Sequence, residues 1–229
     1  FNEVTQKVMS FILAVSPIGV FCLMTWVVSN QGPKILGDLG LVLLAAYIGY
    51  IIHVVLVYTL SVKVFAKMSP LKFFKGVLPA AIFAFTSTSS VASLPVSKEC
   101  CDEMGVEKDI SSFVLPLGAT INMDGTAIYQ CVATIFLAAC CGMTLTLGQM
   151  VTIVVTATLA SIGTAGTPGA GMIMLAMVLE AIGIPVAYIG LIVAVDRLFD
   201  MGRTCLNVTG DIACSLCVTK WESKKTAVK

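Results

Sequence analysis

The chain has 229 residues, of which 58% are hydrophobic and 12% are charged, and its formal net charge is +1. Soluble domains have about 25% charged and about 45–50% apolar residues, so this composition excludes an ordinary soluble protein and, without a basic patch, argues against nucleic-acid binding. Nine cysteines, an odd number mostly within apolar stretches, and the single histidine His53 argue against a disulfide scaffold, a zinc site and a Ser-His-Asp triad, so we expect neither an enzyme nor a resident cofactor.

Six apolar segments follow one another along the chain, which indicates a protein embedded in a lipid bilayer. Four of them exceed the roughly 20 residues that a helix needs to cross the hydrocarbon core. They cover residues 8–28, 36–65, 113–141 and 186–218. We expect these four segments to be transmembrane helices.

The other two segments, residues 73–96 and 149–182, are each interrupted by a cluster of small or polar residues. The clusters read TSTSS at 86–90 and GTAGTPG at 163–169. Each leaves apolar halves of about ten residues, which rise only about 15 Å as helix. Exposed backbone at membrane depth is tolerated only inside protein or beside a watery cavity. The two segments therefore predict re-entrant helical hairpins with polar tips.

The lysine distribution supports this topology. With both interrupted segments as hairpins, eleven lysines fall on one side of the membrane and only Lys34 on the other. Positive loops mark the cytoplasmic side, so we expect a cytoplasmic C-terminus. The hairpins then enter from opposite faces, as in the inverted repeats of many secondary transporters. The expected fold is an all-α membrane protein with transmembrane helices and two opposed re-entrant helical hairpins.

The last segment carries an unusual stripe of polar residues. At 100° per residue, five side chains fall within about 80° of the helix circumference. They are Asp196, Asp200, Arg203, Asn207 and Asp211. A charge at bilayer depth costs at least about 2.5–3.5 kcal/mol, so the stripe must face protein or water. The alternative interpretation is a purely structural ladder of ion pairs, such as Asp200 with Arg203.

The fourth segment contains the run GATINMDGT at 118–126. Its glycines, asparagine and aspartate predict an unwound stretch within a membrane helix. Free carbonyls there, together with the Asp124 carboxylate, are oxygen donors suited to Na⁺. The alternative is a structural kink with a protonated Asp124.

The charges and hydrogen-bonding groups of these polar residues indicate the chemical class of the substrate. The Arg203 guanidinium binds a carboxylate bidentately, and Asp200 one turn away suits an ammonium. Ser89 and Ser90 offer hydroxyl and backbone N–H groups at a half-helix N-terminus, which suits a second carboxylate. The glycine-rich second tip predicts a mobile gate, with tight helix packing as the alternative. Two carboxylates and one ammonium describe an acidic amino acid.

Three long strings carry a resemblance to a known family: PLGATINMDGTAIYQ at 116–130, ASIGTAGTPGAGMIMLAMVLE at 160–180 and DMGRTCLNVTGD at 200–211. They are similar to the dicarboxylate/amino acid:cation symporters, the glutamate and aspartate transporters. The resemblance extends over all six segments. It implies a sodium-coupled elevator, in which a transport domain slides against a homotrimeric scaffold within the plasma or inner membrane.

The resemblance also implies residue roles, with Arg203 on the side-chain carboxylate of aspartate or glutamate and Asp200 on its amino group. The full substrate set is Ser90, Thr126, Thr167, Gly171, Asp200, Arg203, Thr204 and Asn207, with Ser89 beside them. One sodium ion would use Gly118, Asn122, Asn207 and Asp211. A second would use carbonyls of Thr120, Ser161, Ile162 and Thr164 with Met123, and a third Asp124 with Asn122.

The chain departs from the family pattern in two respects. It begins at what resembles the fifth helix of the family, so most of the expected scaffold is absent. At the first tip it has Thr88 where several archaeal members carry arginine, and Arg197 is the candidate to replace that charge.

We accordingly divide the chain into five parts. Residues 1–68 hold two transmembrane helices, the first resembling a scaffold helix, and residues 69–110 hold the first hairpin and a cytoplasmic loop. Residues 111–145 hold the unwound helix, 146–185 the second hairpin, and 186–229 the last helix and a cytoplasmic tail. The alternatives are a proton-coupled dicarboxylate transporter, channel-like anion conduction, and an intramembrane protease with Asp124 and Asp200 as its pair.

Overall fold

The computed structural model describes residues 32–226 continuously, together with scattered positions between residues 8 and 29. The predicted first segment, 8–28, is described only in part, and its described positions are helical. Every regular element in the described part of the chain is helical. Two stretches there, Lys34–Ala66 and Lys108–Cys140, are long and apolar enough to cross a membrane by length and composition.

The predicted helix at 36–65 is one continuous rod with two irregular turns. It begins as α2 (Lys34–His53) and passes through a π-helical turn, η1 (Val54–Tyr58). A short α3 (Thr59–Ser61) and a second π-helical turn, η2 (Val62–Ala66), complete it. Turns of this kind inside α-helices are rare and are frequent at functional sites.

The first predicted hairpin is present as two packed helices, α4 (Pro70–Ser87) and α5 (Ser90–Met104). Pro70 begins α4, where its missing N–H costs nothing. The break is narrower than the TSTSS cluster and consists of Thr88, in the left-handed conformation with φ 53°, and Ser89. The Ser89 side chain then caps α5 by accepting from the Ala92 N–H at 3.2 Å.

The predicted unwinding in the fourth segment is confirmed at Asn122 and Met123, which separate α6 (Lys108–Ile121) from α7 (Asp124–Cys140). The second predicted hairpin is α8 (Leu147–Ile162) followed by α9 (Ala170–Ala181), and these two helices pack together. A loop over residues 163–169 joins them, so the sequence clusters located both interruptions correctly.

The last predicted helix, 186–218, differs from the structure at both ends. Residues from Val186 to Val193 form a 3-10 turn, η3 (Val186–Ile189), and a single turn, α10 (Gly190–Val193). The long helix α11 (Asp196–Thr226) begins only after these turns. The apolar stretch before Asp196 forms a separate short element, in which Leu191 and Ile192 are buried. Hydrophobicity alone did not reveal this boundary.

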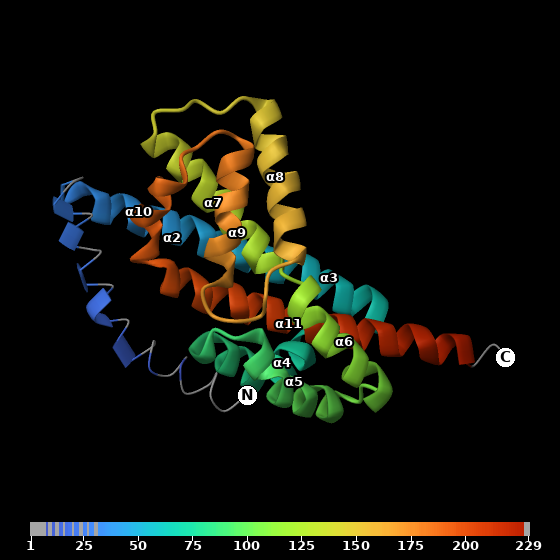
Figure 1. Ribbon diagram of the computed structural model, residues 1–229. Helices are drawn as coiled ribbons and strands as arrows, with labels where there is room; N and C mark the ends of the chain where they lie inside the picture. Colours follow the sequence, from blue (N-terminus) through green and yellow to red (C-terminus); the bar gives the residue numbers. More distant parts are fainter. Residues whose placement is uncertain are drawn as a thin grey trace.

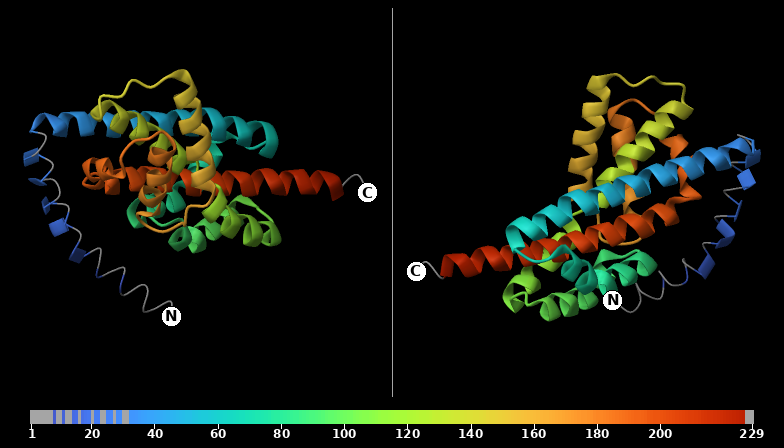
Figure 2. Two further views of the ribbon diagram at one scale, coloured as in Figure 1. Left: turned by 45° about the horizontal axis from the view of Figure 1, so that its top comes forward. Right: turned by 180° about the vertical axis from the view of Figure 1, so that it is seen from behind.

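Helix α11 is the central rod of the fold. At 1.5 Å per residue its 31 residues span roughly 46 Å. It packs against α2, α4, α5, α6 and α7, and Figures 1 and 2 show it running alongside α2 with the hairpin helices on either side. Tyr129, Phe199 and Leu206 lie in the core between these helices. The helices on both sides of the breaks at 88–89 and 122–123 therefore pack against α11.

A capping box stabilises the start of α8, the first helix of the second hairpin, and this stabilisation can be tested. Thr146 accepts from the Gln149 N–H at 3.3 Å, and the Gln149 side chain accepts from the Thr146 N–H at 2.9 Å. Thr146→Ala should cost about 1 kcal/mol and lower the melting temperature in detergent by about 2–4 °C. Thr152→Ala, which removes only a bond to the Gly148 carbonyl, is the matched control. Equal melting temperatures for the two variants would contradict the capping role.

Candidate functional site

The polar stripe of α11 is fully buried, as its spacing predicts. Asp196, Asp200, Arg203, Asn207 and Asp211 are each at most 6% exposed. Helix α11 packs against α6, α7 and the two helices of the first hairpin, and the loop of the second hairpin is hydrogen-bonded to Asp200. The stripe therefore faces a bundle interior.

Arg203 is held on three sides. Its Nε donates to Asp200 Oδ1 at 2.9 Å, and its Nη1 lies 3.5 Å from Asp196 Oδ1. The Cζ atom lies 4.6 Å from the ring centroid of Tyr129, a cation–π contact. The ion pair of the alternative interpretation is thus present, but the buried Nη2 has no hydrogen-bond partner among the described residues. A buried donor without a partner is costly, and a carboxylate beside it would satisfy it.

The two hairpin tips meet directly at Gly166. Its carbonyl accepts from the Ser89 hydroxyl at 2.9 Å and from the Val91 N–H at 3.2 Å. The same loop is tied to α11, because the Gly169 N–H donates to Asp200 Oδ2 at 2.9 Å. In Figure 1 the loop between α8 and α9 lies beside the turn between α4 and α5. The first tip and the second tip together close over the α11 stripe.

Arg197 reaches the first tip. On the sequence alone, it is the candidate to replace the arginine that several archaeal members carry at the position of Thr88. Its Nη1 hydrogen-bonds to the Thr88 hydroxyl. Thr88 is 1% exposed and carries the left-handed backbone of the break. The positively charged guanidinium of Arg197 therefore lies at the first tip, although the tip residues Thr88 and Ser89 are uncharged.

The small cavity between the tips and α11 gathers most of the expected substrate residues. Of the nine, only Ser89 does not line it, since its hydroxyl is engaged by Gly166. The lining includes Ser90, Thr126, Thr167, Gly171, Asp200, Arg203, Thr204 and Asn207. Thr88, Ala165 and Gly166 also line it, although the expected substrate set did not include them. The cavity of about 10 Å³ has room for little more than a water, so a larger solute enters only if a tip moves.

The residues expected around one sodium ion also lie together. Asn122 Nδ2 donates to Asp211 Oδ1 at 2.9 Å and lies 3.3 Å from the Asn207 carbonyl. A side chain at Gly118 would collide with the Asp211 carboxylate. The Asp211 carboxylate and the Asn207 backbone carbonyl therefore lie together beside Asn122, and both are oxygen groups of the kind that hard cations prefer.

The residues expected around the two other sodium ions have fewer contacts with one another. Met123 is buried and lines the same small cavity as Thr164, and its sulfur lies 3.1 Å from Asn207 Nδ2. Thr164 donates its N–H to the Ser161 carbonyl at 3.0 Å. Thr120 and Ile162 lie on exposed faces. Their part in an ion site stays a prediction.

Asp124 has partners that the sequence did not indicate. Its Oδ2 lies 3.0 Å from His53 Nε2 and 2.9 Å from the Tyr58 hydroxyl. Asn122, its expected companion, is engaged by Asp211 instead. The sequence offered no signal for this cluster, because residues five apart lie on different faces of a regular α-helix.

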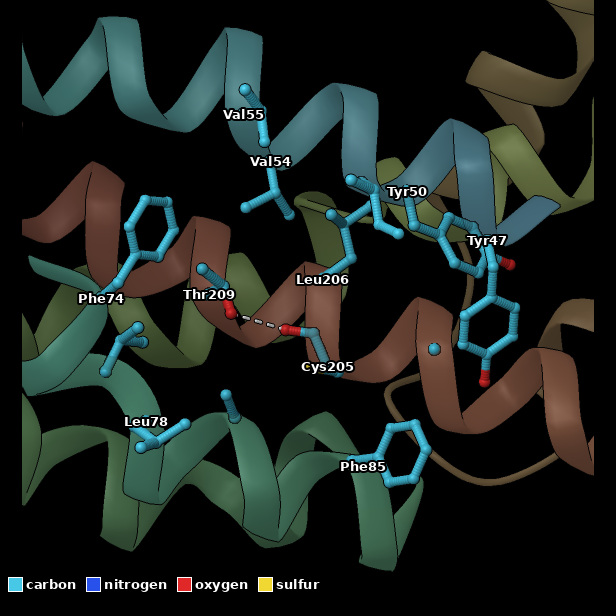
Figure 3. Close-up of a pocket in the computed structure, with 14 residues that line it drawn as sticks. Tyr47, Tyr50, Val54, Val55, Phe74, Leu78, Phe85, Cys205, Leu206 and Thr209 are labelled. Carbon is cyan, nitrogen blue, oxygen red and sulfur yellow. Dashed lines mark hydrogen bonds between the residues drawn. The ribbon is translucent and has the colours of Figure 1, made fainter. Parts of the chain in front are cut away.

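A larger cavity of about 340 Å³ lies between α2, α4 and α11 and is lined almost entirely by apolar side chains. Figure 3 shows Val54, Phe74, Leu78 and Leu206 around it. Its one hydroxyl from α11, on Thr209, already donates to the Cys205 carbonyl at 2.8 Å. None of the residues that line it is charged, so the polar cavity at the tips is the candidate site.

Comparisons with known proteins agree with this geometry. The chain matches the family described as "Sodium:dicarboxylate symporter family" over residues 1–221. It is 42% identical over 213 residues to excitatory amino acid transporter 2 of Homo sapiens, covering 92% of this chain and 37% of that protein. It is also 42% identical over 214 residues to neutral amino acid transporter B(0) of Rattus norvegicus, covering 92% and 39%.

The chain therefore belongs to the sodium:dicarboxylate symporter family, which confirms the resemblance seen in its sequence. The named relatives are transporters and not enzymes. The chain spans well under half the length of these curated relatives.

The meeting of the tips predicts a specific sensitivity at Gly166. A Cβ there would lie 2.6 Å from the Ala119 carbonyl oxygen, a backbone atom that cannot turn away. Gly166→Ala should therefore separate the tips and speed amide exchange of the segment 88–96 by about tenfold, as expected for overpacking of 1–3 kcal/mol. Hydrogen exchange followed by mass spectrometry measures this.

Gly163→Ala is the matched control in the same loop. A Cβ at Gly163 would have only the Ala160 carbonyl at 4.0 Å. Exchange of 88–96 should stay at its original rate in this variant. The same acceleration in both variants, or in neither, would contradict a close contact at Gly166.

Proposed function

We propose that this chain forms the substrate-carrying part of a sodium-coupled secondary transporter for an acidic amino acid, L-aspartate or L-glutamate. The observation that carries the proposal is the Arg203 guanidinium, buried at the cavity between the two tips with Nη2 unpaired. Asp200 beside it supplies a carboxylate for an ammonium group. Family membership supports sodium as the coupling ion.

The pairing inside the cavity suggests how binding and closure are linked. Asp200 Oδ2 accepts the Gly169 N–H, which ties the second tip to α11. Moving this tip away frees that oxygen and widens the cavity, so the ammonium group can replace the loop N–H. The loop over 163–169 then acts as the gate, and its return covers the substrate.

Sodium provides the positive charge that the cavity lacks. The stripe has three aspartates and Arg203, so a second substrate carboxylate needs a further cation nearby. Asn207 belongs both to the expected substrate set and to the expected sodium set. It lines the cavity with its substrate neighbours, and it contacts the sodium set through Asn122, together with Gly118 and Asp211. A sodium ion there would couple to the substrate through this shared side chain.

The relatives alone do not decide between acidic and neutral substrates, because one is named as an excitatory and the other, at the same identity, as a neutral amino acid transporter. Arg203 favours the acidic class for this chain. A neutral side chain would leave its buried Nη2 unpaired, whereas a carboxylate would satisfy it.

We further propose that the protein is a multi-pass protein of the plasma or inner membrane with its C-terminus in the cytoplasm. Within it, the hairpins and α11 move as a unit against a homotrimeric scaffold in an elevator mechanism. The lysine distribution supports the orientation. The many exposed apolar side chains of α2 and α8, such as Leu41, Ile52, Val151 and Leu159, support contact with lipid.

Uptake into liposomes tests the proposed function. The natural full-length protein, reconstituted with an inward sodium gradient, should accumulate radiolabelled aspartate above its external concentration. With choline outside, accumulation should fall to the level of protein-free liposomes. Uptake that follows a proton gradient and ignores sodium would contradict the proposal.

Arg203→Cys tests the substrate class. Losing the guanidinium removes a buried partner of the substrate carboxylate, which costs about 2–5 kcal/mol. Aspartate affinity should therefore fall at least about 30-fold, while neutral amino acids are still bound. Calorimetric titration of both substrates measures the change.

Because Arg203→Cys leaves two aspartates unpaired, Arg203→Lys serves as a second variant. It keeps the positive charge and loses the paired N–H donors of the guanidinium. Unchanged aspartate affinity in either variant would refute the role.

Asp211→Asn tests the sodium assignment. The amide can still accept from Asn122, so the fold should persist while the ion loses a full negative charge. The sodium concentration for half-maximal aspartate binding should rise at least about tenfold, which corresponds to about 1.4 kcal/mol. Asp102→Asn, on the exposed end of α5, is the matched control and should leave the value unchanged. An unaltered sodium response in Asp211→Asn would remove Asp211 from the site.

A further inference from the structure

We propose that His53 and Tyr58 are positioning residues for a sodium ligand: they hold the Asp124 carboxylate in place, and a π-helical turn aims both of them at it. The inference rests on the proposed sodium coupling and assigns a role to the chain's single histidine. Neither residue belongs to the sets expected from the sequence.

Two donors converge on one oxygen of Asp124. His53 Nε2 lies 3.0 Å and the Tyr58 hydroxyl 2.9 Å from Oδ2. The rings of His53 and Tyr58 support each other edge to face, with centroids 5.0 Å apart and planes at 87°. Within the described part of the chain, no hydrogen bond is made to Oδ1. One carboxylate oxygen is therefore fixed and the other is left for a cation.

The backbone between the two donors explains how they reach the same atom. His53 and Tyr58 are five residues apart, which is about 140° around a regular α-helix, so both could not face Asp124. The intervening turn, η1 (Val54–Tyr58), is π-helical and closes i→i+5 hydrogen bonds, which places residues five apart above one another. The irregular turn thus has a geometric purpose at this position.

Tyr58 also links the carboxylate to the substrate helix. Its hydroxyl lies 3.3 Å from the Leu206 carbonyl on α11, the residue before Asn207. Asp124 itself begins α7 immediately after the unwound residues 122 and 123. The carboxylate is therefore held between the rod that contains η1, the broken helix and α11.

The exposure of the pair suits an ion that enters and leaves. The side chains of His53 and Asp124 are 23% and 35% exposed, in contrast to the buried stripe. Side chains that hydrogen-bond to a metal ligand fix its orientation, and their loss typically lowers metal affinity by about 10–100-fold. A structural clamp with no ion role would affect folding but not sodium affinity.

Aspartate binding by the natural full-length protein, measured by calorimetry at a series of sodium concentrations, tests the inference. His53→Ala and Tyr58→Phe should each raise the half-saturating sodium concentration by about tenfold or more. At saturating sodium, aspartate affinity should return to the wild-type value. His53→Gln, whose amide N–H can replace the imidazole donor, should restore most of the sodium affinity.

Tyr47→Phe is the matched control. Tyr47 lies on the same rod and donates its hydroxyl to the Leu198 carbonyl of α11 at 2.8 Å, but it does not contact Asp124. It should leave the sodium dependence unchanged. If His53→Ala fails to fold, Tyr58→Phe carries the test alone.

The outcomes separate the two proposals. A wild-type protein that binds aspartate without regard to sodium overturns the proposed function and this inference with it. A normal wild-type response with unchanged, or tightened, sodium affinity in Tyr58→Phe overturns this inference alone. An equal loss in Tyr47→Phe and Tyr58→Phe would show general weakening of the contact with α11 and would also overturn it.

Discussion

Burial of charge along one face of α11 governs the arrangement of this molecule. Taking an ion out of water costs several kcal/mol, and each of Asp196, Asp200, Arg203 and Asp211 is almost completely buried. The cost is offset only if oppositely charged or hydrogen-bonding groups are brought to the same face. Asp196, Asp200 and the Tyr129 ring surround Arg203, while Asn122 serves Asp211. The neighbouring helices must therefore approach α11 with polar groups.

The helix breaks supply those groups. A regular helix uses its own N–H and C=O groups internally, whereas a broken one frees several at each end. The Gly125 N–H donates to Asn207 at 2.8 Å, and the Gly169 N–H donates to Asp200. The Gly166 carbonyl joins the first tip to the second. All three breaks, at 88–89, 122–123 and 163–169, thus bring unpaired backbone groups to α11 or to each other, where a solute and ions can compete for them.

Much of this was readable in the sequence, for physical reasons. The stripe followed the period of a regular helix, and α11 is regular from Asp196 onward, so its buried face was predicted correctly. The breaks were marked by residues that disfavour continuous helix, such as Gly163 and Asn122. The cluster of His53, Tyr58 and Asp124 was missed, because a π-helical turn changes the period locally and leaves no compositional mark.

Other features depend on distances that a pattern does not contain. The reach of Arg197 to Thr88 and the start of α11 after a separate short element were not derivable from periodicity. The pairing of Arg203 with both Asp196 and Asp200 is a matter of side-chain conformation in the closed cavity. Sequence reasoning named most of the residues that line the small cavity, but not the way in which they engage one another.

Calorimetric titration of aspartate into the natural full-length protein, in sodium chloride and then in choline chloride, tests the central claim most directly. The account predicts saturable binding in sodium that is lost in choline, because the buried aspartates beside Arg203 and Asn207 need a cation before a second carboxylate can be held. Binding of equal strength in both salts, or no binding in either, would contradict it.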